Sequence, residues 1–258
     1  MKNINIFLLI ILLGFIWTVF VEPYILTVKK IQIKSEQLKG TKIVFASDFH
    51  IKPYEKFRLE KIVKKINAQN PDLVLLGGDF VNGHKKGFTL PIENIADELQ
   101  NIHSNYGVIT VLGNHDNWQG KDEIIKALTN AKITILQNEN IKINDKFFVA
   151  GLEDIQTQNP DINMALKNTS NPTILLTHSP DTFPDVPENV FLTLAGHTHG
   201  GQVVLFRPIL VPSIYGKKYA YGLNRENGKT LYTTRGLGSS ILPVRFNCLP
   251  EIVVIEFM

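Results

Sequence analysis

The chain has 258 residues, of which 44% are hydrophobic and 20% are charged, a composition that fills a core and excludes disorder as the main state. Its 27 lysine and arginine residues against 24 aspartate and glutamate residues give a formal net charge of only +3. That charge is too low for the dense basic surface that nucleic-acid binding normally needs, so no nucleic-acid partner is predicted. Cys248 is the only cysteine, which excludes an intrachain disulfide and a cysteine-based zinc site.

An apolar run follows the N-terminus directly: residues 6–21 carry no charge. As a helix, this run would reach about 24 Å, against roughly 30 Å for the hydrocarbon core of a bilayer. Its end at Val21 is bulky and lacks the small residues of a signal-peptide cleavage site. We therefore predict an uncleaved N-terminal membrane helix in residues 1–27, followed by one domain in residues 28–258.

Lysines flank the apolar run unevenly. Lys2 precedes it, whereas Lys29, Lys30 and Lys34 follow it. Because cytoplasmic flanks of membrane helices carry more positive charge, this count slightly favours a domain on the cytoplasmic side of the inner membrane. The terminal amine reduces the difference to a single charge, so an exported domain stays open as the alternative.

From Thr41 onward, short β-branched runs alternate with amphipathic stretches. This alternation predicts strand, helix, strand, helix, strand in that order. The predicted strands are 42–46, 73–76 and 108–112, and the predicted helices are 56–69 and 92–103. A βαβαβ order implies an α/β fold with a largely parallel sheet.

The second half of the chain is dominated by predicted strands instead. Residues 144–146 separate two short apolar runs and have the composition of a hairpin turn. The predicted strands are 141–143, 147–150, 173–177, 191–195, 202–206, 231–234 and 252–257.

Polar side chains gather where predicted strands end, and five of the seven histidines follow a strand immediately. In open α/β sheets, ligands bind outside the carboxyl ends of the strands, so residues far apart in sequence converge there. The candidate metal ligands at these strand ends are Asp48, His50, Asp79, Asn114, His178, His197 and His199.

These seven ligands are hard or borderline donors. They are too many for one tetrahedral zinc ion and suit two divalent ions that share a bridging carboxylate. Residues two apart in an extended segment point the same way, so Asp48 can act together with His50. His197 can act with His199 for the same reason. The pattern therefore predicts a dinuclear metal site.

The segments that carry these ligands are Asp48-x-His50, Gly78-Asp79, Gly113-Asn114-His115-Asp116, His178 and Gly196-His197-Thr198-His199. Their order and strand context resemble the motif series of the calcineurin-like metallophosphoesterase superfamily over residues 42–206. The resemblance implies a four-layer α/β sandwich, in which two mixed β-sheets face each other and helices cover the outside. It also implies a metal-dependent hydrolase of phosphoester or pyrophosphate bonds.

The resemblance assigns a role to each residue. The first metal ion would be held by Asp48, His50, Asp79 and His199, and the second by Asp79, Asn114, His178 and His197. His115 matches the histidine that protonates the leaving oxygen, and Asp116 is the expected orienting residue. Two such ions would clamp phosphoryl oxygens and make water acidic enough to supply hydroxide near pH 7. The oxygen and nitrogen donors suit Mn²⁺ first, with Fe or Zn²⁺ as alternatives.

Further motifs lie in the C-terminal part of the chain. They are Gly200-Gly201-Gln202-Val203, Tyr219-Ala220-Tyr221-Gly222-Leu223, Thr234-Arg235-Gly236-Leu237-Gly238 and Pro243-Val244-Arg245-Phe246-Asn247. These segments resemble a membrane-anchored bacterial branch of the superfamily, which includes the UDP-2,3-diacylglucosamine pyrophosphatases of lipid A biosynthesis. That branch implies a lipid surface as partner.

Basic residues near these motifs agree with an anionic substrate. Arg207, Lys217 and Lys218 lie close to aromatic residues, and Arg235 lies in a glycine-rich stretch, a combination that suits a lipid-linked diphosphate. An exported or cell-wall phosphodiesterase is the alternative enzyme. A non-catalytic scaffold is less favoured because the ligand set has no gap. The sequence leaves the oligomeric state open.

Overall fold

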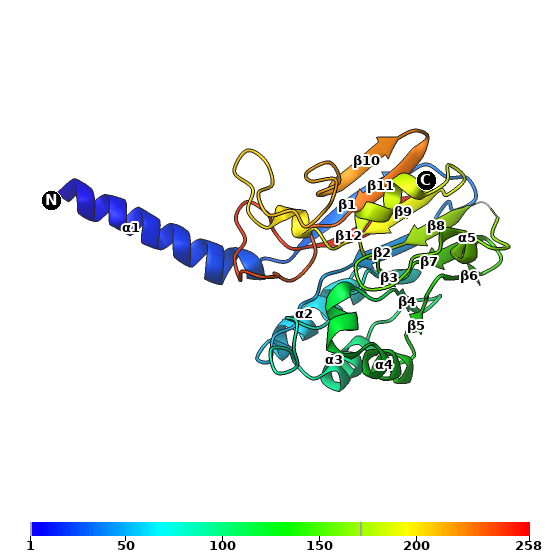
Figure 1. Cartoon of the computed structure of the whole chain (residues 1–258), viewed down its shortest axis with the longest axis horizontal. Coiled ribbons are helices and arrows are strands. Elements are labelled where there is room, and N and C mark those ends of the chain that lie inside the picture. The colour runs from blue at the N-terminus through cyan, green and yellow to red at the C-terminus, as the bar shows by residue number, and fades with distance from the viewer. Residues whose placement is uncertain (1, 171) are drawn as a thin grey trace.

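The computed structural model describes residues 2–170 and 172–258. Two six-stranded sheets stack face to face, and helices cover the outer face of the first sheet (Figure 1). The strand order is β1-β12-β2-β3-β4-β5 in the first sheet and β10-β11-β9-β8-β7-β6 in the second. Buried side chains from both sheets, such as Phe45 and Leu194, form a common core between them.

The first sheet is mixed. It contains β1 (Thr27–Ile33), β2 (Lys42–Ala46), β3 (Leu73–Leu76), β4 (Val108–Thr110), β5 (Thr134–Ile135) and β12 (Glu251–Phe257). The strands β2 to β5 run parallel, whereas β12 is antiparallel to β2 and parallel to β1. Because β1 begins at Thr27, the domain includes the last residue of the predicted anchor segment.

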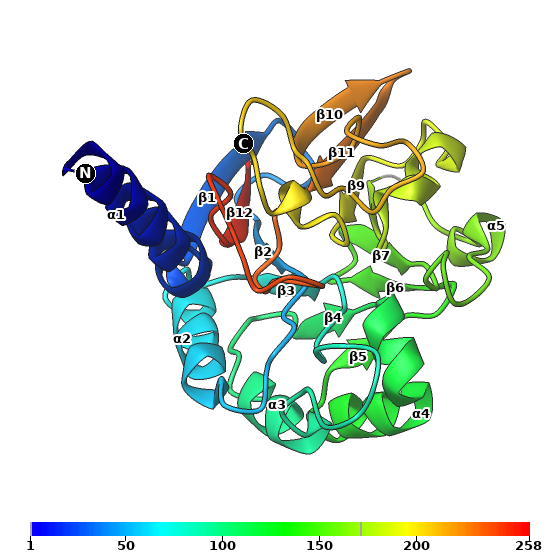
Figure 2. The ribbon, with the colours of Figure 1, turned by 60° about the vertical axis from the view of Figure 1, so that its left-hand side comes forward.

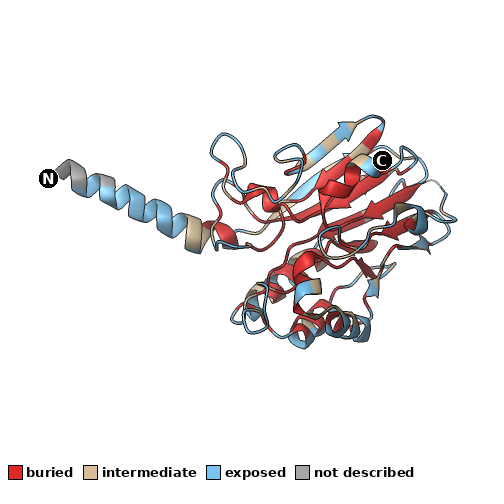
Figure 3. Ribbon diagram, in the orientation of Figure 1, coloured by how far each residue is buried: buried red, intermediate tan, exposed pale blue. Residues whose placement is uncertain are grey.

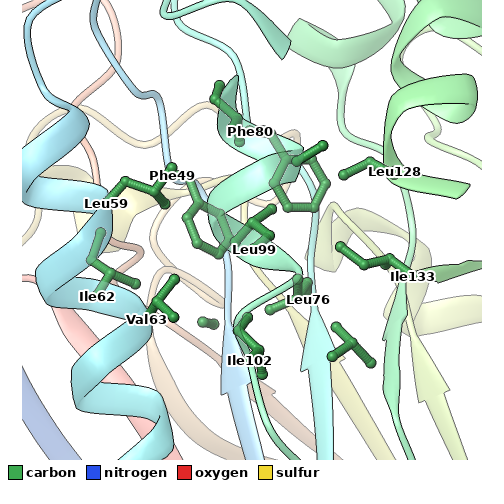
Figure 4. Close-up of a cluster of buried hydrophobic side chains, with 14 of the residues drawn as sticks. Phe49, Leu59, Ile62, Val63, Leu76, Phe80, Leu99, Ile102, Leu128 and Ile133 are labelled. Atoms are coloured by element: carbon green, nitrogen blue, oxygen red, sulfur yellow. The ribbon is translucent and has the colours of Figure 1, made fainter. Parts of the chain in front are cut away.

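Three helices pack on the outer face of this sheet: α2 (Lys56–Asn67), α3 (Ile92–Leu99) and α4 (Asn114–Asn130). Figure 4 shows their apolar side chains meeting those of the sheet, with Phe49 beside Phe80 in the centre. The two phenyl rings stack at 5.2 Å. They lie in the segments that directly follow β2 and β3, so this packing also fixes the loops at those strand ends.

The second sheet is mixed as well. It contains β6 (Glu139–Ile143), β7 (Phe147–Gly151), β8 (Thr173–Leu176), β9 (Leu192–Ala195), β10 (Gly222–Glu226) and β11 (Lys229–Thr233). The four inner strands are parallel and the two edge strands antiparallel. Its outer layer is thin, formed by α5 (Ile162–Ala165) and a 3-10 helix (Pro180–Asp185). The predicted pair of mixed sheets is confirmed.

The predicted strand at 202–206 is wrong. Only isolated bridges form there, from Val203 to Phe246 and from Val204 to Pro208. The backbone enters the segment with positive φ at Gly201 (79°) and Gln202 (51°), which is incompatible with a strand. The chain from residue 202 to 221 therefore contains no strand or helix.

The N-terminus forms α1 (Lys2–Ile16), a π-helical turn (Trp17–Val21) and a 3-10 turn (Glu22–Tyr24). Helix α1 projects away from the sandwich in two views (Figures 1 and 2), and its described side chains are exposed (Figure 3). Among the described residues, no helix has both the length and the apolar character needed to cross a membrane. The expected membrane-spanning helix is thus not found.

The base of this helical segment is joined to the C-terminal loop. The amide of Arg245 donates to the carbonyl of Thr18 at 2.9 Å, and the amide of Cys248 donates to Glu22 Oε1 at 2.7 Å. The other carboxylate oxygen of Glu22 accepts from the indole of Trp17. Although α1 projects, the π-helical and 3-10 turns that follow it are therefore fixed to the loop that precedes β12.

Candidate metal centre

All seven predicted ligands lie together in the structure, and all are buried. They occupy the segments that follow β2, β3, β4, β8 and β9. The carboxyl ends of parallel strands meet at one edge of a sheet, and here the two sheets bring their edges together. The ligand cluster is therefore the product of strand order, with donors from both sheets.

Backbone conformation aims these side chains. Five of the seven predicted ligands have positive φ: Asp48 (57°), His50 (43°), Asp79 (55°), His197 (69°) and His199 (52°). Residues other than glycine adopt this conformation rarely, and it costs of order 1–3 kcal/mol for each. The packing of the surrounding residues compensates this backbone strain, and the ligand side chains converge on one place.

Asp79 lies at the centre of the cluster. Its Oδ2 atom is 3.3 Å from Nε2 of His50 and also 3.3 Å from Nε2 of His178. These two histidines come from different sheets. A carboxylate that is equidistant from two groups of nitrogen donors has the geometry of a bridging ligand between two cations.

The first group of donors is Asp48, His50 and His199, whose ligand atoms all lie within 4.8 Å of one another. Nε2 of His50 is 3.1 Å from Nε2 of His199, which is 3.9 Å from Oδ1 of Asp48. The other oxygen of Asp48 is buried without a hydrogen-bond partner. A buried, unpartnered carboxylate oxygen is costly unless a cation compensates it.

The second group is Asp79, His178 and His197, again within 4.8 Å. Oδ1 of Asn114 is 3.1 Å from Nε2 of His178, and Nδ1 of His197 is 3.2 Å from the same nitrogen. The outer nitrogen of His197, Nε2, lies 2.9 Å from the side-chain amide of Gln156. His197 therefore turns Nδ1 toward the cluster, and Gln156 holds the ring in that orientation.

The protonation states suit metal binding. Burial lowers the pKa of His50 to about 4 and that of His197 to about 3, so both are neutral imidazoles, the form that ligates metals. Burial alone would raise the pKa of Asp79, but His178 and His50 outweigh it and hold that pKa well below the usual range. The central carboxylate is therefore ionised. Asp79 in turn raises the pKa of His178 well above its usual value, so His178 carries a proton that a bound divalent ion would displace.

These residues fit two divalent ions, because the donors are nitrogen and oxygen atoms and Asp48 has an unpartnered oxygen. Three overlapping groups of donors form in the cluster: the two above and a third made of His50, Asp79 and His115. Gly236 adds a further observation, because a Cβ there would lie 2.7 Å from Oδ2 of Asp48. Only glycine allows the backbone to approach this carboxylate so closely, and its φ of 68° is one that glycine adopts freely.

His115 lies beside the ligand groups, at the start of α4. Its Nδ1 is 2.9 Å from the carbonyl of Gly83, and its Nε2 is 3.4 Å from the hydroxyl of Ser240. Fixing Nδ1 as the donor to Gly83 leaves Nε2 directed to the cleft. The ring also lies close enough to His50 and Asp79 to form a group of possible ligands with them, so its predicted role as a proton donor stays a prediction.

Asp116 does not orient His115, contrary to the prediction. Its Oδ2 accepts from the amides of Asp79 (2.7 Å) and Gly113 (3.0 Å), and its Oδ1 accepts from the amide of Phe80 (2.9 Å). The carboxylate therefore ties the loop after β3 to the start of α4. The carbonyl of Gly83 takes the orienting position that the resemblance assigned to Asp116.

The cluster opens into a cleft of about 480 Å³. Further aromatic rings stand at its edge, where His84 stacks on Trp118 at 4.4 Å and meets His115 edge-on at 5.1 Å. Gln156 follows β7 as the predicted ligands follow their strands, so its position could have been found by the same reasoning. His84 gave no such signal, because it follows no predicted strand.

The basic residues singled out in the sequence do not line this cleft. Lys218 pairs with Glu226 at 2.6 Å, and the guanidinium of Arg235 lies 4.8 Å above the ring of Tyr221. Arg207 and Lys217 are likewise absent from the lining. The expected basic patch for a diphosphate is therefore not part of the cleft in the described structure.

Comparison with known proteins agrees with this site. The model of the calcineurin-like phosphoesterase family matches residues 41–206, and the chain belongs to that family. It is 32% identical to the uncharacterized metallophosphoesterase YkuE of Bacillus subtilis, over 93% of this chain and 88% of that protein. It is 33% identical to phosphodiesterase YaeI of Escherichia coli, over 84% of this chain and 82% of that protein.

Among solved structures, a 5'-nucleotidase precursor from Thermus thermophilus matches with a TM-score of 0.48 and 16% identity. The match covers 76% of this chain and 48% of the other. Family membership and the ligand groups together identify the chain as a metal-dependent hydrolase of phosphoester bonds.

Proposed function

We propose that this protein hydrolyses phosphodiester or pyrophosphate bonds at a membrane surface, with two divalent ions in the cluster around Asp79. The observation that carries the proposal is the central position of Asp79, 3.3 Å from a histidine of each donor group. Bound there, the ions would polarise the phosphoryl oxygens and make hydroxide available at neutral pH. Because Nδ1 keeps its hydrogen on the carbonyl of Gly83, His115 would act as an imidazolium, donate the Nε2 proton to the leaving oxygen and become a neutral imidazole.

The charge of the cleft favours a diester over a monoester. No lysine or arginine is among the described residues that line the cleft, and the basic side chain of Lys52 lines the adjoining hollow that shares His115. Positive charge for the substrate would therefore come mainly from the bound ions. A diester carries one negative charge on its phosphate and a monoester carries nearly two. The relative from Escherichia coli is named a phosphodiesterase, which agrees with this preference.

Association with a membrane is supported by the exposed helix. Apolar side chains such as Leu9, Ile10 and Leu12 of α1 are more than half exposed, and burying them in lipid would be favourable. This requires contact with the bilayer and does not require α1 to cross it. Lys29, Lys30 and Lys34 follow, and each would add about 1 kcal/mol near an anionic leaflet.

The narrower proposal is that the substrate is UDP-2,3-diacylglucosamine in lipid A biosynthesis, which calls for a domain on the cytoplasmic side. Exposed apolar side chains at the helix base, such as Phe20 and Ile25, favour a lipid-linked substrate, whereas the lack of basic residues in the described cleft lining favours a simple diester. An exported or cell-wall phosphodiesterase is thus the second candidate. Reporter activity from a fusion after Met258 separates them, because activity only outside the cytoplasm excludes the lipid A role.

A hydrolysis screen tests the reaction itself. Purified protein with Mn²⁺ should hydrolyse a soluble aryl diester faster than the corresponding monoester, and chelation should abolish the activity. A preference for the monoester would contradict the proposed bond type. A screen that includes UDP-2,3-diacylglucosamine then decides between the two candidate substrates.

Membrane association needs a separate test on the full chain. Leu9→Glu combined with Leu12→Glu should release the protein from sedimenting anionic lipid vesicles while soluble diester hydrolysis continues. Leu223→Glu is the matched control, because Leu223 is an exposed leucine on β10, away from α1. Equal sedimentation of both variants would argue against α1 as the membrane contact.

A further inference from the structure

The cleft has two chemically different walls. The metal ligands and His115 form one wall, and apolar side chains from two irregular loops form the other. The apolar side chains are Ile209, Leu210, Val211, Pro212, Ile241 and Leu242. We call them the apolar wall. Ile209 and Leu242 are about half exposed, and Ile241 is 87% exposed, so folding alone gains little from placing them there.

The loop that carries Ile241 is held over the cleft. The amide of Ser240 donates to Oε1 of Gln202 at 2.7 Å, and Nε2 of Gln202 donates to the carbonyl of Ser240 at 2.9 Å. This two-way clamp ties one loop of the apolar wall to the start of the other. The apolar wall is therefore held in place by hydrogen bonds, although its residues belong to no strand or helix.

The conformation of Ile241 is unusual. Its φ is 62°, a value that β-branched residues avoid and that asparagine or glycine adopts easily. Strain of this kind collects at functional sites. Ile241 is both strained and exposed, and it lies at the mouth of a cleft beside the metal cluster. Contact between its side chain and a bound substrate would explain this placement.

We infer that the apolar wall binds the hydrocarbon chain of a phosphodiester whose phosphate lies at the metal cluster. This inference rests on the proposed function and adds the part of the substrate that determines specificity. An aliphatic chain fits better than a nucleobase, because the residues of the wall offer no aromatic face and Trp118 is already stacked on His84. The wall also continues toward the apolar N-terminal segment, since Val203 and Val204 pair with the loop joined to Thr18.

The test uses soluble p-nitrophenyl diesters that differ only in the second alcohol, methyl or hexyl, below the concentration at which they form micelles. Each methylene that the wall covers should raise kcat/KM about fourfold. We therefore expect the hexyl ester to exceed the methyl ester by at least about tenfold. Equal kcat/KM values would overturn the inference and leave the proposed function intact, whereas no hydrolysis of either ester would contradict the proposed function itself.

Two variants with a matched control locate the effect. Ile241→Asn relieves the strained conformation, so the thermal unfolding temperature should not fall, but the ratio of hexyl to methyl activity should drop at least about threefold. Leu210→Gln, which nearly keeps the volume, should do the same from the other loop. Ile214→Asn changes an exposed isoleucine outside the cleft lining and should keep the wild-type ratio. A ratio unchanged in both wall variants would overturn the assignment.

Discussion

The two walls of the cleft are built in different ways. Asp79 and the other ligands are buried and stand directly after strands, so the hydrogen bonds of two sheets fix their positions. Ile241 and its neighbours stand on irregular loops and are exposed. Rigid elements thus hold the reacting groups, where small displacements cost most, and loops hold the groups that select a substrate.

A buried arginine holds the loop that carries part of the apolar wall. Arg245 is fully buried and donates to the carbonyls of Arg235 (2.8 Å), Cys248 (2.9 Å) and Gly238 (3.1 Å). Burial lowers its pKa to about 10, so the guanidinium is still charged at neutral pH. Arg245 thus donates hydrogen bonds to carbonyls of a loop whose own backbone forms no β-ladder.

Removing the central ligand should have the largest effect. Asp79→Ala takes away the carboxylate that faces both donor groups, so activity should fall by about 10³ or more, since bound ions supply several kcal/mol of transition-state stabilisation. Bound metal, measured by mass spectrometry, should fall as well. Asp145→Ala, at an exposed position, is the control. Full activity in the Asp79 variant would refute the dinuclear site.

Changing the proton donor should leave the metal in place. His115→Gln should reduce kcat by about 10² to 10⁴, the usual contribution of a positioned acid, with metal content near that of the wild type. His103→Gln changes an exposed histidine and should have no effect. Loss of metal in the His115 variant would make it a ligand and not a proton donor.

Replacing Arg245 tests separately whether it holds the apolar wall in place. Arg245→Met leaves several buried carbonyls without donors and should lower the free energy of unfolding by about 3 kcal/mol, as measured by urea unfolding. Arg225→Met, an exposed position on β10, should change it by less than about 0.5 kcal/mol. Similar values for both variants would show that Arg245 does not hold the loop together.

The smallest effect is expected at Gln156, which contacts the outer nitrogen of His197. Gln156→Ala should weaken Mn²⁺ binding about tenfold, because partners of this kind typically contribute about 10- to 100-fold to metal affinity. Gln156→Glu puts an oxygen in place of the amide nitrogen that contacts the ring. That oxygen can accept from Nε2–H of His197 when Nδ1 binds the ion, so this variant should restore most of the affinity. Metal titration followed by calorimetry measures both. An unchanged affinity in the alanine variant would remove Gln156 from the site.

The wall of the cleft that carries the metal ligands could be predicted from the sequence, because the motifs that form it are local. Motifs such as Asp48-x-His50 stand next to short β-branched runs, and parallel strands bring such ends together wherever they lie in the chain. The order of the early strands followed from the same patterns, whereas the pair of mixed sheets was implied by the family resemblance alone. Helix α4 was missed because its first half is polar, and Gly120 interrupts it with a φ of 133°.

The apolar wall could not be predicted from the sequence in this way. Val203 and Val204 suggest a strand, but the positive φ of Gln202 redirects the chain before a ladder can form. The role of Asp116 was misjudged because its carboxylate reaches amides of the preceding strand end, a tertiary contact without a local signature. Exposure of Ile241 is likewise a property of the folded chain alone.

The proposed reaction depends on two ions that share Asp79. Crystals of the Mn²⁺-loaded protein, measured at a wavelength where manganese scatters anomalously, test it directly. We expect two anomalous peaks, one on the side of His50 and His199 and one on the side of His178 and His197, with the Asp79 carboxylate between them. A single peak, or peaks away from Asp79, would contradict it.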